Sequence, residues 1–200
     1  MGMPVPILRD AIRDAQDRTG REAKLILTPH FNIVPGGDPE NEPERAFDNC
    51  KELGATFCMP HQGVTDALLD RMTRKIRDID RYTSLIRERG MVPGLSTHMP
   101  EAVILADKTG ADLETYIQIY NAIGFLMQIE VDWVHRMIWQ CQKPVITIKP
   151  LAAGRLPPLV GLAFAWSTVR EMDAVCVGTS SAYEAEEVIE LSLSVLERRA

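Results

Sequence analysis

The sequence has no excess of basic residues, since 22 Lys and Arg stand against 28 Asp and Glu, for a net charge of −6. Nucleic acid is therefore an unexpected partner, because phosphate backbones are bound mainly through Lys and Arg. No apolar run approaches the about 20 residues that a membrane span needs. Met1–Asp10 also lacks the basic start of a secretory signal. We expect a cytoplasmic protein with no membrane partner.

The four cysteines form no recognisable motif, and the signature motifs of several common enzyme families are absent. Cys50, Cys58, Cys141 and Cys176 are far apart and form no CxxC pair, which argues against a zinc knuckle or a redox motif. We expect them to be reduced and to pack as small hydrophobes. The sequence also contains no GxGxxG, P-loop, HExxH or GxSxG motif.

What the chain does contain is a regular alternation of short apolar runs with longer amphipathic ones. The hydrophobic content of 46% is enough for a sizeable core, and no low-complexity linker divides the chain, so we expect one domain. Apolar residues recur at helical spacing in Pro43–Leu53 and Leu68–Arg89, and Gly54 and Gly90 follow as expected C-terminal caps. Short apolar runs bounded by turn residues predict six strands, at Lys24–Pro29, Thr56–Pro60, Val92–Ser96, Tyr116–Tyr120, Val145–Lys149 and Ala174–Gly178.

Several of these strands are apolar on consecutive residues, as in a parallel sheet that is buried on both faces. The expected class is therefore α/β. Periodicity alone leaves open whether the strands form an open doubly wound sheet or most of an eight-stranded barrel. Gly36-Gly37 lies in a polar loop and is interpreted as a turn rather than as a phosphate-binding loop.

Four segments resemble motifs of the aldo-keto reductases, which are (β/α)8 barrels that use a nicotinamide cofactor. They correspond in order to the ends of the family's fifth to eighth strands. They are GLSTHMPE at Gly94–Glu101, YIQIYN at Tyr116–Asn121, PVITIKPLAAG at Pro144–Gly154 and AVCVGTSS at Ala174–Ser181. The resemblance extends over most of the chain from about Ala23, and it implies an incomplete barrel with about six βα units after an N-terminal helical segment at residues 1–22.

The resemblance also implies roles for individual residues. It places His61 on the family's catalytic histidine, which orients a substrate carbonyl, and His30 where the catalytic lysine stands. Ser96, Thr97 and Gln118 would hydrogen-bond the nicotinamide carboxamide. The remaining cofactor-binding positions are Lys149, Leu151, Gly154, Arg155, Thr179, Ser180 and Ser181.

The departures from the family pattern are equally specific. The catalytic aspartate and tyrosine belong to the family's first two strands, and the 200 residues contain no counterpart of that part. Ile148 replaces the tyrosine that stacks on the nicotinamide. Glu184 and Glu187 stand near the expected adenosine end and would repel a 2′-phosphate, so NAD(H) is favoured over NADP(H).

Strand-end histidines also permit a different chemistry. His30, His61 and His98 follow three successive predicted strands, and imidazoles can converge on zinc, which makes a metal-dependent hydrolase or lyase the alternative enzyme.

Several of the candidate residues also have other interpretations. His61 could equally cap a backbone group, and Lys149 could attract an anionic group or act as an amine nucleophile. Ser181, with Glu184 three residues later, is also a plain helix N-cap pattern. Trp133, Trp139 and Trp166 are expected to pack in the core.

The interpretation that these residues favour is a divergent aldo-keto-reductase-like oxidoreductase acting on a small carbonyl or hydroxyl compound. His61 would polarise the oxygen, with His30 as a candidate proton donor. A barrel remnant that only binds a ligand or partner is the non-catalytic alternative. Because a six-stranded wall would leave two unpaired edges, we also expect a truncated barrel that forms a homo-oligomer.

Overall fold

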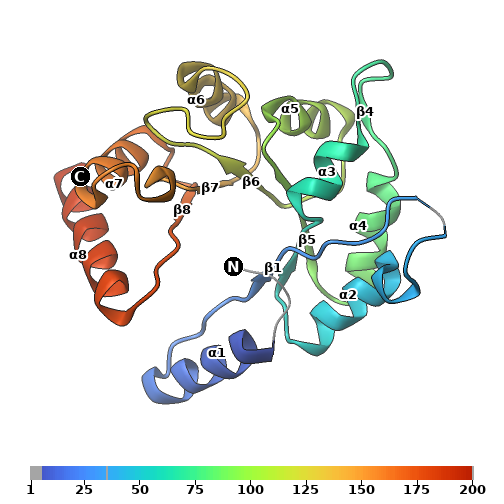
Figure 1. Ribbon diagram of the computed structural model, residues 1–200, viewed down its shortest axis with the longest axis horizontal. Helices are drawn as coiled ribbons and strands as arrows, with labels where there is room; N and C mark the ends of the chain where they lie inside the picture. The colour runs from blue at the N-terminus through green and yellow to red at the C-terminus, as the bar shows by residue number, and fades with distance from the viewer. Residues whose placement is uncertain (1–5, 35, 200) are drawn as a thin grey trace. The chain divides into compact units, whose positions relative to one another are not determined.

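The structure is a computed structural model that describes residues 6–34 and 36–199 (Figure 1). It divides into two compact units. Among the described residues, the first comprises 6–34, 36–97 and 105–115, and the second comprises 98–104 and 116–199. No helix among the described residues is long and apolar enough to cross a membrane.

The first unit contains three parallel strands and the helices between them. Strand β1 (Ile26–Leu27) pairs with β2 (Phe57–Cys58), and β2 pairs with β5 (Val92–Thr97). The other elements of the unit, in chain order, are α1 (Pro6–Thr19), the 3-10 helix η1 (Pro39–Asn41), α2 (Pro43–Glu52), α3 (Gln62–Leu68), the antiparallel pair β3 (Leu69–Asp70) and β4 (Lys75–Ile76), and α4 (Ile79–Glu88).

An aromatic cluster holds the segment after β1 against α2 and α4. The ring of Phe31 lies 5.2 Å from that of Phe47 in α2 and 4.9 Å from that of Tyr82 in α4. All three side chains are buried. Burial of a large apolar side chain is worth about 2 kcal/mol, so this cluster fixes the backbone that carries the adjacent His30.

The second unit repeats the pattern of parallel strands joined by helices. Strand β6 (Thr115–Ile119) pairs with β7 (Val145–Ile148), and β7 pairs with β8 (Ala174–Cys176). Gln118 stands opposite Thr147, and Ile148 stands opposite Cys176. The remaining elements are α5 (Pro100–Thr109), which is divided between the two units, α6 (Val131–Gln140), the 3-10 turn η2 (Ala152–Gly154), α7 (Pro158–Thr168) and α8 (Ala182–Arg199), which packs on α7.

The predicted α/β class is confirmed, and each of the six predicted strands is present as a parallel strand. Most are shorter than predicted, and β1 and β2 contain only two residues each. The helix predicted at Pro43–Leu53 forms as α2, and Gly54 and Gly90 adopt the left-handed backbone of a C-terminal cap, with φ of 81° and 71°.

The continuous helix predicted at Leu68–Arg89 is wrong. The chain instead forms a short hairpin, β3–β4, and helix α4 begins only at Ile79. Arg74 and Asp78 have left-handed backbone φ of 55° and 56°, which interrupts any right-handed helix. Asp70 stabilises the turn by accepting hydrogen bonds from the backbone N–H groups of Met72 and Thr73.

The prediction that the tryptophans pack in the core is also wrong for two of them. Trp133 and Trp139 of α6 are 39% and 52% exposed. Trp139 lies at the surface, where its indole N–H donates to the carbonyl of Thr168, 2.8 Å away. Cys50, Cys58 and Cys141 are buried as expected, Cys176 is half-buried, and all four are free thiols.

Candidate functional site

His61 begins helix α3 in the first unit. Its Nδ1 atom accepts a hydrogen bond from the backbone N–H of Gly63 at 3.1 Å, so His61 is the N-cap of the helix. Because Nδ1 is the acceptor, the neutral imidazole carries its proton on Nε2. The cap therefore sets the tautomer and leaves Nε2–H as the donating group of the ring.

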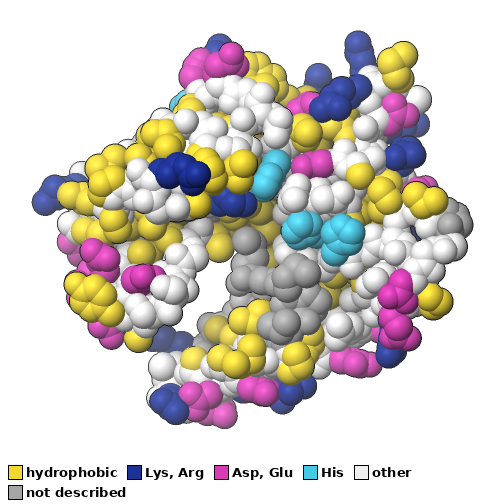
Figure 2. All heavy atoms as spheres, in the orientation of Figure 1, with side chains coloured by type: hydrophobic (Ala, Val, Ile, Leu, Met, Phe, Trp, Pro, Cys, Tyr) yellow, Lys and Arg dark blue, Asp and Glu magenta, His cyan; other side chains and the backbone are white. Residues whose placement is uncertain are grey.

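His30 and His61 lie side by side because the two strand ends are joined through the backbone. The His61 N–H donates to the carbonyl of Pro29 at 2.9 Å, which continues the β1–β2 pairing beyond the strands. The two ring centroids are 5.8 Å apart and tilted by 51°. Histidine side chains are visible side by side on the face of the molecule shown in Figure 2. The structure thus brings together the two residues predicted to be catalytic.

Asp66 is a residue that sequence reasoning missed. It lies on α3, and its carboxylate accepts a hydrogen bond from the hydroxyl of Thr97 at the end of β5. Thr97 and the adjacent Ser96 are both buried, as expected for residues at the carboxyl end of an interior strand. Asp66 lies on a helix, five residues after His61, so the sequence pattern that marks the end of a strand does not identify it.

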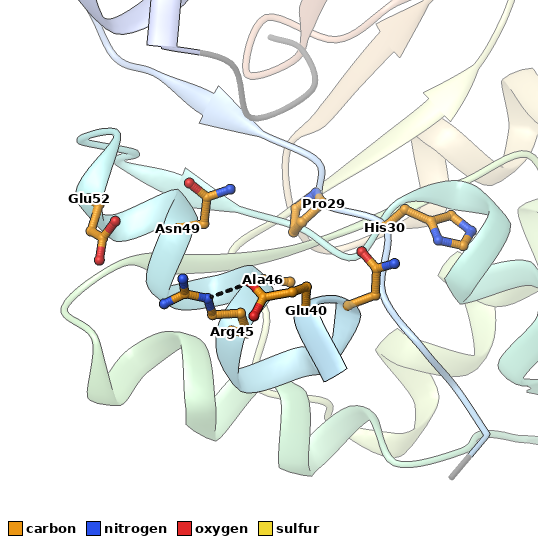
Figure 3. A pocket seen from close by; sticks show the side chains of 8 residues that line it. Pro29, His30, Glu40, Arg45, Ala46, Asn49 and Glu52 are labelled. Atoms are coloured by element: carbon orange, nitrogen blue, oxygen red, sulfur yellow. Dashed lines mark hydrogen bonds and ion pairs between the residues drawn. The ribbon is translucent and has the colours of Figure 1, made fainter. Parts of the chain in front are cut away.

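A pocket of about 390 Å³ opens beside His30 in the same unit (Figure 3). It lies between the segment after β1, the η1 turn and one face of α2. Its lining is mainly polar and consists of Pro29, His30, Glu40, Asn41, Arg45, Ala46, Asn49 and Glu52. Of these residues, sequence reasoning identified only His30.

In the second unit, Gln118 is a buried amide with an unsatisfied acceptor. The residue is 0% exposed, and its Nε2 donates to the carbonyl of Ile119 at 3.3 Å. Its Oε1 atom has no hydrogen-bond donor among the described residues. Burying an amide oxygen without a donor costs about 1–3 kcal/mol, so this position favours a bound group that donates a hydrogen bond.

The segment after β7 has an unusual left-handed backbone. Lys149, Ala152 and Ala153 have φ of 58°, 49° and 55°, and Gly154 follows with 80°. Each left-handed non-glycine residue costs about 1–2 kcal/mol, and such strain concentrates at ligand-binding segments. Arg155, at the end of the segment, stacks over the ring of Phe125 at 4.0 Å.

Thr179, Ser180 and Ser181 precede α8 and are exposed. The predicted N-cap forms, since the hydroxyl of Ser181 accepts from the N–H of Glu184 at 3.2 Å. The Glu184 carboxylate accepts from the backbone N–H and the hydroxyl of Ser180, at 2.7 and 2.9 Å. These bonds lower the pKa of Glu184 below its ordinary value and keep a negative charge beside Ser180.

Among residues 6–34 and 36–199, no group of three or more His, Cys, Asp or Glu side chains could hold a metal ion. His30 and His61 form a pair in the first unit, whereas His98 belongs to the second. One nitrogen of His61 is already engaged by the Gly63 N–H. The zinc alternative therefore gains no support from the geometry.

The structure is similar to two solved structures from Pseudomonas aeruginosa, each provisionally assigned as an aldo-keto reductase. They share 14% and 12% identity with this chain and have a TM-score of 0.64, covering 94% of this chain and 74% and 73% of the respective neighbours. A mutant FabK from Thermotoga maritima is also similar, with a TM-score of 0.50 and 17% identity over 88% of this chain and 50% of its own. No protein-family profile matches the chain, and no curated protein matches its sequence.

These similarities concern the fold. They support the expectation of an incomplete barrel in its coarser form, which is an α/β fold with parallel strands like part of the barrel of a provisionally assigned aldo-keto reductase. The identities are too low to transfer any residue's role. Any inference about chemistry therefore rests on the geometry of this chain's own residues.

Proposed function

We propose that the protein is an aldo-keto-reductase-like oxidoreductase that reduces or oxidises a small carbonyl or hydroxyl compound with a nicotinamide cofactor. The observation that carries the proposal is the buried Oε1 of Gln118, which has no donor among the described residues. A nicotinamide carboxamide has an NH₂ group that would satisfy this acceptor. The fold similarity to aldo-keto reductases agrees with that assignment.

The other residues proposed to bind the cofactor lie at or after the carboxyl ends of the strands, although the hydroxyl groups of Thr97 and Ser180 already donate to Asp66 and Glu184. Ser96 and Thr97 end β5, and Lys149 follows β7 directly. The segment Leu151–Gly154, which is left-handed from Ala152 on, would accept the pyrophosphate together with Arg155. Thr179, Ser180 and Ser181 precede α8, where backbone N–H groups attract anions. When bound, the cofactor would supply or accept the hydride.

His61 would act on the oxygen of the substrate. Its Nε2–H, which is set by the cap on Nδ1, can donate to a carbonyl oxygen and draw electrons from the carbon that receives the hydride. The reduced oxygen must then gain a proton, and His30 stands 5.8 Å from His61 between ring centroids as the candidate donor. In the reverse reaction His30 would accept that proton.

NAD(H) is proposed in preference to NADP(H). The Glu184 carboxylate is held at Ser180, whose hydrogen bonds favour its ionised form and lower its pKa below the ordinary value. Glu187 adds a second negative charge on the first turns of the same helix. A 2′-phosphate near these groups would be repelled.

The catalytic part of the proposal is tested by two substitutions at His61. A panel of small aldehydes and ketones is incubated with NADH, and loss of NADH absorbance measures turnover. His61→Asn keeps an N-cap acceptor, whereas His61→Ala removes it. We expect both variants to lose about 100-fold or more in turnover, and only His61→Ala to lose about 1 kcal/mol of stability. Turnover by His61→Asn at the unaltered rate would refute the role of His61.

Self-association is proposed as a separate property. In the first unit β1 pairs only with β2, and in the second unit β8 pairs only with β7, as far as the described residues extend. Unpaired strand edges are ready sites for pairing with another chain. Light scattering is expected to show a homo-oligomer, and a stable monomer that binds no hydrophobic dye would contradict this.

A further inference from the structure

The pocket beside His30 has a polar wall that folding does not require. Arg45, Asn49 and Glu52 stand at positions i, i+4 and i+7 of α2, so they share one face of the helix. Phe47 and Cys50 lie on the opposite side and are buried in the core. The helix therefore packs through one face and presents the other to the pocket.

The charges in the pocket do not cancel. The Nε of Arg45 lies 3.3 Å from the Glu40 carboxylate, drawn as a dashed line in Figure 3, so these two side chains neutralise each other. Glu52 makes no hydrogen bond or ion pair with any residue in the described part of the chain. The pocket consequently has one uncompensated negative charge, at the end opposite His30 in Figure 3.

The remaining lining favours hydrogen bonding over apolar contact. The amide of Asn49 can donate and accept, the amide of Asn41 already donates one hydrogen bond to the Asp38 carboxylate at 3.3 Å, and His30 adds an imidazole. Among the described residues that line the pocket, Pro29 and Ala46 are the apolar ones. A volume of about 390 Å³ lies within the range of small-molecule sites.

We propose that this pocket binds a small polyhydroxylated molecule that bears an ammonium group. The ammonium group would pair with Glu52, and the hydroxyl groups would hydrogen-bond to Asn49 and Asn41 along the pocket. An anionic ligand is disfavoured by the uncompensated charge of Glu52, and an apolar ligand finds little surface to bury. The inference does not depend on the reductase proposal, because it concerns binding without turnover.

The test is a titration of the 200-residue chain with three linear six-carbon probes that differ at one end only. Glucamine carries an ammonium group, glucitol a hydroxyl and gluconate a carboxylate. Calorimetry measures affinity near neutral pH and low salt, and the NMR signals of the His30 ring report the site. We expect glucamine to bind about three- to fivefold more tightly than glucitol, as for one accessible charge pair, and gluconate to bind most weakly.

Two variants test whether the difference in affinity between glucamine and glucitol arises in the pocket. Glu52→Gln keeps the shape of the side chain, and it should abolish the difference between glucamine and glucitol. Glu88→Gln, an exposed carboxylate of α4 outside the pocket, should leave that difference unchanged. The proposal is overturned if glucamine does not bind, if gluconate binds as well as glucamine, or if Glu52→Gln retains the selectivity. Loss of NADH turnover with these binding results intact would contradict only the reductase proposal.

Discussion

The two ends of strand β7 in the second unit are built in opposite ways. Before the strand begins, Arg170 donates to the carbonyl groups of Cys141 and Lys143 and pairs with Asp173. Asp173 is buried and also accepts from the Val145 N–H at 2.8 Å. The pairing raises the pKa of Arg170 above its ordinary value. Every hydrogen bond in this cluster fixes the start of the strand.

After the strand ends, the chain tolerates strain and an unsatisfied group. The backbone turns left-handed at Lys149 and again from Ala152 to Gly154, and the neighbouring strand carries the buried Gln118 with its unpaired oxygen. In βα barrels the amino ends of the strands serve stability and the carboxyl ends serve function. The contrast agrees with the proposed cofactor site at the carboxyl end of β7.

The largest expected effect is at the amino end of β7. Asp173→Ala leaves Arg170 without its partner in a setting where the two side chains are 12% and 0% exposed. Removing one member of a buried ion pair costs about 3–5 kcal/mol. Urea unfolding should show that loss, whereas Asp132→Ala, in an exposed pair with Arg136, should change stability by less than about 0.5 kcal/mol. Equal losses of stability in the two variants would contradict the stabilising role assigned to the buried pair at the amino end of β7.

At the carboxyl end, Ala153→Gly should stabilise the protein. Ala153 is exposed and has φ of 55°, which glycine adopts without a steric penalty. The expected gain is about 0.5–1 kcal/mol after the entropy of glycine is included. The matched control is Ala163→Gly inside α7, which should lose about 1 kcal/mol. A loss at Ala153 equal to that at Ala163 would show that the segment is not strained.

Gln118→Leu tests whether the buried amide is maintained at a cost. The substitution removes an unpaired acceptor and one 3.3 Å hydrogen bond. We expect thermal unfolding to show unchanged stability or a gain of up to about 1 kcal/mol. Asn121→Leu is the control, because both ends of that amide are bonded to Phe125, and it should lose stability. A strong loss at Gln118 would mean that the residue is structural.

The smallest expected effect is a pH dependence at the start of α8. Bonds from Ser180 lower the folded-state pKa of Glu184 below 4.5, so their contribution is fully present above that pH and is lost as the pH falls through the lowered value. The amide signal of Ser180 should shift in that acidic window. In Glu184→Gln the shift should be absent, and its persistence would assign it to another group.

The sequence predicts the strands and the order of the elements well, because burial on both faces leaves a strong apolar signal in β5 and β6, and β7 is apolar at three of its four positions. It does not predict the break after Leu68, where the helical spacing continues but left-handed residues at Arg74 and Asp78 end the helix. Helix propensities do not predict which residues adopt a left-handed backbone.

The site is predicted less completely than the fold. His30 and His61 are identified because they follow predicted strands, and a strand end is visible in the sequence. Asp66 and the polar face of α2 are not, because both depend on how a helix packs against its neighbours. His61 also acts as a helix cap, so the structural and catalytic interpretations of this residue are compatible.

Binding of NADH by the 200-residue chain tests the proposal most directly, with calorimetry of the unaltered chain and of Gln118→Leu under identical conditions. The proposal predicts saturable binding that is tighter for NADH than for NADPH and that weakens about tenfold or more in the variant, as loss of a buried hydrogen bond to the ligand requires. Absence of NADH binding, or binding that the variant leaves unchanged, would contradict it.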